Sequence, residues 1–291
     1  MFGFLNLNKP QGPTSHDIVA HVRRLFPGKT RVGHAGTLDP FAEGVLVLCV
    51  GPATRLAGYV QARPKQYTAE ITLGATSSTD DPEGEITVTA GARPAPKGAI
   101  SHVLERFVGM IEQTPPAYSA VHVGGKRAYK LARRGEKPDL PARPVKIHSV
   151  ELLGYDPPRL TVEVRCSSGT YIRSLARDVG AALGVGGYCS RLVRTAVGLF
   201  NIEDALPPDS LDPQRDLISP VVALDLLDKV TVNEADSGAL TMGRSVSCPG
   251  GRPAAGEVAV LNERQELICI AEVTKDGNSL HPVKVFVGQQ R

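Results

Sequence analysis

Alternation of hydrophobic and polar residues predicts most of the strands in this chain. Apolar side chains occupy every second position at 67–73 and 160–166, which is typical of a strand that buries one face. A partner strand is expected at 145–155. The unbroken apolar run at 45–50 instead predicts a fully buried strand.

A second spacing, in which apolar residues recur every three or four positions, predicts amphipathic helices. After a short opening strand and a Pro/Gly turn, one such helix is expected with Ser15 as its N-cap and Leu25 closing its apolar stripe. Further helices are expected at 54–61, at 99–109 and after Gly169.

The C-terminal part of the chain has a different pattern. Residues 204–220 are rich in Pro and Asp, which favours a linker, and 230–287 indicates a separate compact unit. Its strands are expected at 257–261, 266–271 and 283–287.

Composition limits the class of protein. The 291 residues are 42% hydrophobic and 22% charged, as in soluble globular proteins. No apolar run is long enough to cross a bilayer, and the first residues do not form a secretory signal, so a cytoplasmic location is expected. The five cysteines are far apart with no CxxC pair, which predicts buried free thiols.

Positive charge is concentrated in one segment, although the net charge is only +3. Residues 126–146 contain eight Lys or Arg against two acids, directly after a hairpin expected at Gly124-Gly125. Arg127, Lys130 and Arg134 have helical spacing on one face. Such a segment suits phosphate binding, but it also fits an ordinary solvated face.

The loop before the buried strand is the first candidate active site. Gly36 and Gly44 allow tight bends, and Pro40 restricts the conformation of Asp39, whose carboxylate is therefore fixed in direction. On spacing alone, however, an Asp-Pro pair is better explained as a turn or helix-cap pair, and His34 taken alone is better explained by a structural role.

A fixed acid, an aromatic residue and an arginine, far apart in the sequence, are compatible with a single chemistry. They are Asp39, Tyr67 and Arg173. Arg173 falls in the first turn of a helix, where a cation is unfavourable, so a carboxylate or phosphate partner is expected. Pairing with Arg lowers the pKa of an Asp by typically ~1–3 units, which suits a nucleophile more than a proton donor. Tyr67 or Tyr171 offers a face on which an extruded base stacks. The loop acids Asp80 and Asp81 fit turn and hydrogen-bonding residues better than metal ligands.

Five stretches carry a specific resemblance to a known family. They are LNKPQGPTSHD at 7–17, GHAGTLDP at 33–40, KQYTAEITLG at 65–74, PPAYSAVHVGGKRAYKLARRGE at 115–136 and CSSGTYIRSLARDVG at 166–180. In this order they resemble the tRNA pseudouridine synthase B family over about the first two hundred residues. The triplet Phe41-Ala42-Glu43 departs from the pattern of that family, in which Leu-Ala-Thr or a similar triplet is more usual.

The resemblance implies a fold and a domain division. The fold would be α+β, with a mixed, mostly antiparallel sheet flanked by helices and crossed by an RNA cleft. Residues 1–225 would form the catalytic domain, with a basic thumb inserted at about 117–146. Residues 226–291 would form a small β-rich domain of the PUA type that contacts RNA.

The resemblance also implies an activity and roles for named residues. The partner would be tRNA, and a flipped uridine at position 55 of the T loop would be isomerised to pseudouridine. Asp39 would be the nucleophile, attacking C1′ or uracil C6, with Arg173 as its ion-pair partner. Tyr67 would stack on the base with its hydroxyl near the C5 proton. The other expected site residues are His34 inside the T loop, Tyr171 and Leu192 in the pocket, Lys9 as support for the loop, and Arg127, Lys130 and Arg134 on the RNA backbone.

Isomerisation needs no redox change and no activated donor, so neither a metal nor an organic cofactor is expected. We expect no obligate protein partner and a monomer. Two alternatives stay open: a non-catalytic protein that binds or folds tRNA, and a transglycosylase that releases a free base.

Overall fold

The structure is a computed structural model that describes residues 1–286 except 120, 137, 250–255 and 275–276. Its larger part is built on a nine-stranded sheet in the order β1-β3-β12-β4-β11-β10-β7, with β2 paired to β3 and β13 paired to β12. The strands are β1 Gly3–Lys9, β2 Val32–His34, β3 Glu43–Val50, β4 Lys65–Leu73, β7 Gly109–Gln113, β10 Arg143–Asp156, β11 Arg159–Cys166, β12 Gly187–Val197 and β13 Phe200–Asn201. Only the pair β3 and β12 is parallel in this sheet, so the predicted mixed, mostly antiparallel fold is confirmed.

Most of the helices and short 3-10 turns pack on the nine-stranded sheet, whereas the last helix packs on the C-terminal unit. The helices are α1 Ser15–Arg23, α2 Ala57–Gln61, α3 Lys97–Glu105, α4 Ala128–Ala132, α5 Ile172–Ala182 and α6 Glu234–Thr241, and the 3-10 turns are η1 Gly51–Leu56, η2 Ile202–Asp204, η3 Pro208–Ser210 and η4 Pro220–Leu224. Apolar residues of α1, α3 and α5 pack with one face of the sheet in one buried cluster. A second cluster joins the other face of β1 and β3 to η1, α2 and the C-terminal unit. None of the helices in the described part of the chain is long and apolar enough to span a membrane.

The N-cap of the first helix lies one residue earlier than predicted, and the helix itself begins at Ser15. Thr14 is the N-cap, and its hydroxyl and the Asp17 carboxylate form a capping box. The expectation that Ser15 caps the helix was wrong, because its hydroxyl is buried against the chain at Leu38 instead. Leu25 lies beyond the end of α1 and is 43% exposed, so it does not belong to the buried stripe.

Residues 204–220 are not a free linker. They form backbone hydrogen bonds along β1, from Leu206 N to Asn6 O at 3.0 Å and from Phe4 N to Ile218 O at 2.9 Å. Because β1 is an edge strand, these bonds satisfy backbone groups that would otherwise be unpaired. The Pro and Asp content indicated irregular backbone correctly, but it gave no sign of this packing.

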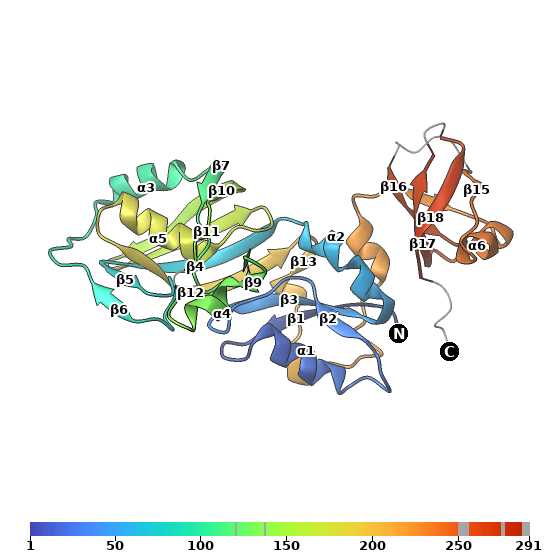
Figure 1. Ribbon diagram of the computed structural model, residues 1–291, viewed down its shortest axis with the longest axis horizontal. Coiled ribbons are helices and arrows are strands. Elements are labelled where there is room, and N and C mark those ends of the chain that lie inside the picture. Colours follow the sequence, from blue (N-terminus) through green and yellow to red (C-terminus); the bar gives the residue numbers. More distant parts are fainter. Residues whose placement is uncertain (120, 137, 250–255, 275–276, 287–291) are drawn as a thin grey trace.

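The C-terminal unit contains a five-stranded sheet in the order β14-β16-β17-β18-β15. Its strands are β14 Lys229–Thr231, β15 Val246–Ser247, β16 Glu257–Leu261, β17 Leu267–Val273 and β18 Ser279–Val285. The last strand begins four residues earlier than expected, and position 287 of the expected strand lies outside the described residues. Figure 1 shows this unit as a separate lobe beside α2.

Two short hairpins complete the fold: β5 Ala75–Ser77 with β6 Ile86–Val88, and β8 His122–Val123 with β9 Lys126–Arg127. The second hairpin turns at Gly124 and Gly125, as predicted, and both glycines have positive φ. It lies with α4 in the connection between β7 and β10, which is the segment predicted to be a thumb.

Candidate active site

Asp39 lies in the loop that joins β2 to β3, and buried polar side chains hold this loop from several sides. The Ser15 hydroxyl accepts a hydrogen bond from Leu38 N at 2.8 Å and donates one to Leu38 O at 2.9 Å. The residue next to Asp39 is therefore fixed to the start of α1. The capping box at Thr14 makes this possible, because it leaves the Ser15 hydroxyl free.

Lys9 supports the loop from beneath. Its side chain is fully buried, and Nζ donates to the carbonyls of Pro10, Pro40 and Ala42 at 2.8, 3.2 and 2.7 Å. Burial lowers the pKa of Lys9 to about 8, although the charges of Asp39 and Glu43 oppose this shift. Lys9 therefore supports the Asp39 loop, because its ammonium group donates to three backbone carbonyls.

Arg194 holds the other end of the loop. Its guanidinium is buried on β12 and donates to the carbonyls of Val45, Thr37 and Gly36 at 2.7, 3.2 and 3.2 Å. Gly44 allows the two strands to come this close, because a Cβ there would lie 2.3 Å from the Arg194 carbonyl oxygen. Sequence reasoning missed Arg194, yet a charged residue at an apolar-face position of a central strand is a usable signal.

Arg173 is the partner of Asp39. Its Nε lies 2.9 Å from Asp39 Oδ2, so the predicted ion pair is present. The Arg173 side chain is only 4% exposed, whereas that of Asp39 is 35% exposed. One carboxylate oxygen is thus oriented by a rigid buried guanidinium while part of the group faces outward, and this arrangement suits a nucleophile.

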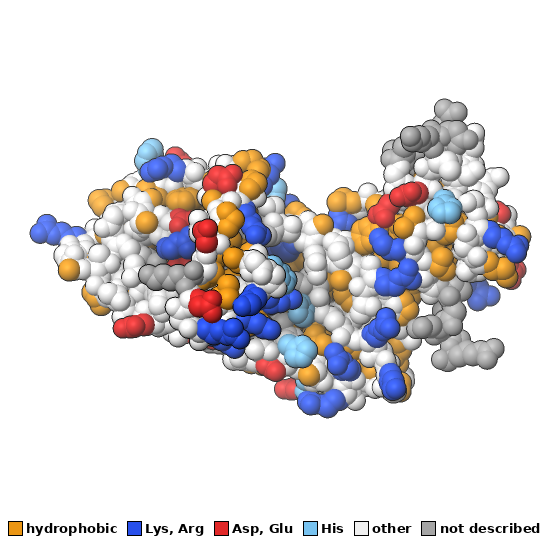
Figure 2. Space-filling view, viewed as in Figure 1, with side chains coloured by type: hydrophobic (Ala, Val, Ile, Leu, Met, Phe, Trp, Pro, Cys, Tyr) orange, Lys and Arg blue, Asp and Glu red, His pale blue; other side chains and the backbone are white. Residues whose placement is uncertain are grey.

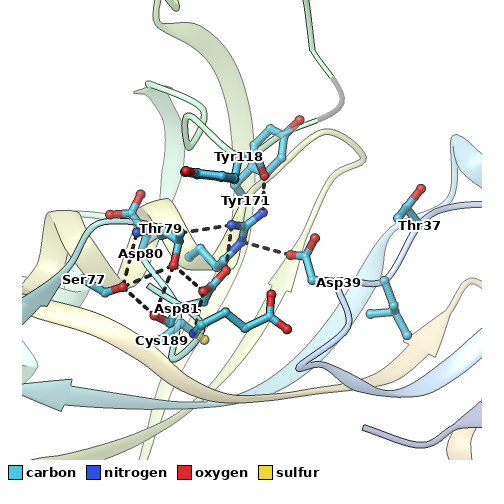
Figure 3. A network of polar contacts seen from close by, with 12 residues as sticks. Thr37, Asp39, Ser77, Thr79, Asp80, Asp81, Tyr118, Tyr171 and Cys189 are labelled. Carbon is cyan, nitrogen blue, oxygen red and sulfur yellow. Dashed lines mark hydrogen bonds and ion pairs between the residues drawn. The ribbon is translucent and has the colours of Figure 1, made fainter. Parts of the chain in front are cut away.

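The same guanidinium holds a second carboxylate. Arg173 Nη1 lies 2.9 Å from Asp81 Oδ2 and donates to Thr79 O at 3.0 Å, and Nη2 donates to Tyr118 O at 2.9 Å. Figure 3 shows Asp39 and Asp81 approaching this guanidinium from different sides. Asp81 was expected to be a turn residue. Its carboxylate does accept a turn hydrogen bond from Glu83 N at 3.0 Å, so this expectation is confirmed. Asp81 is in addition a buried partner of Arg173, and sequence spacing gives no indication of that contact.

Asp80 and Arg177 form a neighbouring ion pair, with Arg177 Nη1 at 2.9 Å from Asp80 Oδ2. Asp80 has a positive φ of 61°, which Asp tolerates better than most residues. This local turn directs adjacent acids to successive arginines of α5. The loop between β5 and β6 is thereby attached to the helix that carries Arg173.

The electrostatic environment of Asp39 differs from the expected one. Burial raises the pKa of Asp39, and the charge of Asp81 adds to this effect, while Arg173 and Lys9 lower it. The prediction of a lowered pKa was wrong, because the desolvation of the carboxylate outweighs its ion pair. Arg173 is therefore the main group that opposes protonation of Asp39.

Two tyrosines lie near this pair. Burial raises the pKa of Tyr67 on β4 and of Tyr171 at the start of α5, and the Asp39 charge contributes to both shifts. The charge of the nearby Arg194 guanidinium partly offsets the rise in the pKa of Tyr67. Tyr171 is held by Gln113, whose Oε1 accepts from Tyr171 N at 2.7 Å.

The remaining expected pocket residues come from β2 and β12. Leu192 is buried on the apolar face of the sheet, opposite Ala69 in the register of β4 and β12. His34 is half-buried, and burial together with the Arg194 charge lowers its pKa. Within the described residues, His34 Nδ1 is buried without a hydrogen-bond partner.

The predicted basic residues lie on and beside α4. Arg127 immediately precedes this five-residue helix, Lys130 lies within it and Arg134 follows it, and all three are exposed. The expectation of one continuous helical face was therefore only partly correct, because the helix ends at Ala132. Leu131, on the same helix, is buried. Figure 2 shows Lys and Arg side chains gathered where Figure 1 places α4.

These features together define the class of protein. A partly exposed carboxylate is held by a buried guanidinium, with buried Tyr67 and half-buried Tyr171 beside it and exposed cations nearby. This arrangement is compatible with an enzyme that acts on a nucleic-acid base, and the fold identifies the class. The chain superposes on the solved structures "Structure of H/ACA RNP bound to a substrate RNA containing 2'-deoxyuridine" and "Crystal Structure of a Cbf5-Nop10-Gar1 Complex". Both give a TM-score of 0.74 and cover 99% of this chain and 86% of the other, at 25% and 28% identity. The protein is a pseudouridine synthase.

The chain belongs to the TruB family of pseudouridylate synthases, whose N-terminal domain model matches residues 23–172. It is 41% identical to tRNA pseudouridine synthase B of Heliobacterium modesticaldum, over 98% of this chain and 95% of the relative. It is 47% identical to the protein of that name from Symbiobacterium thermophilum, over 79% and 78% of the two chains. The resemblance found in the sequence is confirmed, and family membership favours an enzyme over a non-catalytic RNA-binding protein.

Proposed function

We propose that this enzyme isomerises uridine to pseudouridine at position 55 in the T loop of tRNA, with Asp39 as the nucleophile. The observation that carries the proposal is the 2.9 Å ion pair between buried Arg173 and half-exposed Asp39. The substrate class is supported by the tRNA pseudouridine synthase B relatives, which are similar to this chain over most of its length.

Asp39 would add to C1′ or to uracil C6, and the bond between C1′ and N1 would break. The uracil would then rotate and rejoin C1′ through C5, which loses a proton while N1 gains one. Tyr67 would stack on the base with its hydroxyl near that C5 proton, close to the charge of Arg194. Tyr171 and Leu192 would line the pocket.

The uridine has to leave its RNA loop to reach Asp39. Flipping a base costs on the order of a few kcal/mol, and least where the nucleotide is already in a loop. His34 would occupy the space that the base leaves, because β2 carries it at the start of the Asp39 loop. Phosphate contacts of Arg127, Lys130 and Arg134 would offset part of the cost.

The test uses the purified chain and an unmodified tRNA transcript, with pseudouridine mapped at nucleotide resolution. We expect product at position 55 alone. The chain is assayed by itself, so activity also tests our expectation that no protein partner is required. The partners in the titles of the two solved structures above belong to those complexes. Free uracil in the mixture, in place of pseudouridine, would indicate the transglycosylase.

Asp39→Asn tests the nucleophile. We expect the single-turnover rate to fall by more than about 10³-fold while tRNA binding stays largely unchanged, because the amide is isosteric but does not form the covalent intermediate. Asp156→Asn is the matched control, since the Asp156 side chain is 87% exposed. Substantial residual turnover in Asp39→Asn would remove Asp39 from this role.

A further inference from the structure

A second basic surface is formed by residues that precede Asp39 in the sequence, whereas α4 follows it. Residues 18–38 contain four Lys or Arg and neither Asp nor Glu. All four cations, Arg23, Arg24, Lys29 and Arg31, are exposed. We name these four residues the α1–β2 basic surface, because they lie at the end of α1 and in the connection to β2.

The positive charge of this surface is not neutralised locally. Among the described residues, its four cations form no ion pair with an acid. The acid that contacts this segment is Asp209, which pairs with His21 at 3.4 Å and is itself 93% exposed. Four like charges kept close together repel one another, so an anionic partner lowers their free energy.

Strand β2 connects this surface directly to the Asp39 loop. Arg23 Nη2 donates to Val32 O at 3.3 Å, and Gly51 N donates to Arg31 O at 2.7 Å. From Arg31 the chain passes along β2 to His34, roughly 10 Å at the rise of a strand. An RNA whose loop meets His34 therefore has its neighbouring phosphates within reach of Arg31.

The two basic surfaces are presented together. Figure 2 shows Lys and Arg side chains at the position of α4 and further ones along the region of α1 and β2 on the same face of the molecule. Basic segments thus flank the Asp39 loop on both sides. This arrangement fits a polyanion that lies across the site, and it is broader than a single bound nucleotide requires.

We infer that the α1–β2 basic surface binds phosphates of the tRNA stem that adjoins the target loop. The inference rests on the proposed function and adds to it a second set of backbone contacts. These contacts would be independent of sequence, since they reach phosphates and not base edges. They would contribute affinity without taking part in the isomerisation.

The variant Arg24→Gln/Lys29→Gln/Arg31→Gln tests the inference and leaves Arg23, which also bonds β2, in place. Each lost phosphate contact lowers the slope of log K against log salt by about 0.7–0.9, so we expect the slope for tRNA to fall by about 2 to 3. At 0.1 M salt, affinity should therefore fall roughly 100- to 1000-fold. The rate at saturating tRNA should not change.

The matched control removes the same charge elsewhere. Arg93, Lys97 and Arg106 are exposed in and around α3, and their triple Gln variant should retain the salt slope of the wild type. An unchanged slope in the α1–β2 variant, or an equal loss in the α3 control, would overturn the inference. If the wild type forms no pseudouridine, the proposed function fails instead, and the salt slopes still report whether the surface binds RNA.

Discussion

At the scale of single residues, the site depends on the balance of charges around Asp39. Burial raises the pKa of this carboxyl, and two neighbours act on it in opposite directions: Arg173 lowers the pKa and Asp81 raises it. The side chain has to be ionised to act as a nucleophile. Activity is therefore expected to fall as the pH decreases through the pKa of Asp39.

Arg173→Lys and Asp81→Asn should shift the low-pH limb of the pH–rate profile in opposite directions. The lysine variant loses the bond from Nε, so the pKa of Asp39 rises and the limb shifts to higher pH. The Asn variant removes a nearby negative charge, so the limb shifts to lower pH. We expect shifts of roughly 1 unit, measured as single-turnover rate against pH. Shifts of the same sign in both variants would contradict this account of the site.

The residues that sequence reasoning found and missed differ in a physical way. Local features singled out Asp39 and Arg173: one is an acid fixed by the following Pro, and the other is a cation in the first turn of a helix. The family resemblance then implied their roles. Asp81 joins the site through its tertiary contact with Arg173 of α5, and Arg194 through its contacts with the β2–β3 loop and β3. Their partners are more than ninety residues away in the sequence, and no spacing rule relates them.

At the scale of elements, periodicity predicted the sheet better than the ends of its helices. The alternation at 67–73 and 160–166 became the paired strands β4 and β11. The helix predicted at 99–109 instead spans Lys97–Glu105. Helix ends depend on capping hydrogen bonds, such as that of Thr14, and hydrophobic spacing does not contain this information.

The basic thumb leads to a prediction at this scale. Arg127, Lys130 and Arg134 are exposed on one short hairpin-helix unit, so their replacement by Gln should weaken tRNA binding without disturbing the core. We expect the salt slope of binding to fall by about 2 to 3. The α3 triple variant is again the control, and an unchanged slope would argue against phosphate contact by the thumb.

At the scale of the whole molecule, the C-terminal unit is held against the catalytic sheet by specific polar contacts. Tyr59 of α2 donates to Glu257 Oε2 of β16 at 2.6 Å and accepts from Lys284 Nζ of β18 at 2.8 Å. Phe286 stacks on Phe2 with ring centroids 5.2 Å apart. The C-terminal unit is therefore joined to α2 and to the N-terminus by both polar and aromatic contacts.

Tyr59→Phe should loosen this attachment. The substitution keeps the ring but removes a hydroxyl that bonds two charged groups, so we expect a loss of about 1–2 kcal/mol in the free energy of unfolding. Urea titration measures the loss, and proteolysis between the two units should become faster. Tyr155→Phe is the matched control, because within the described residues the buried Tyr155 hydroxyl has no hydrogen-bond partner. Its removal should leave stability unchanged or slightly higher, and an equal loss in both variants would show that the Tyr59 hydroxyl does not join the units.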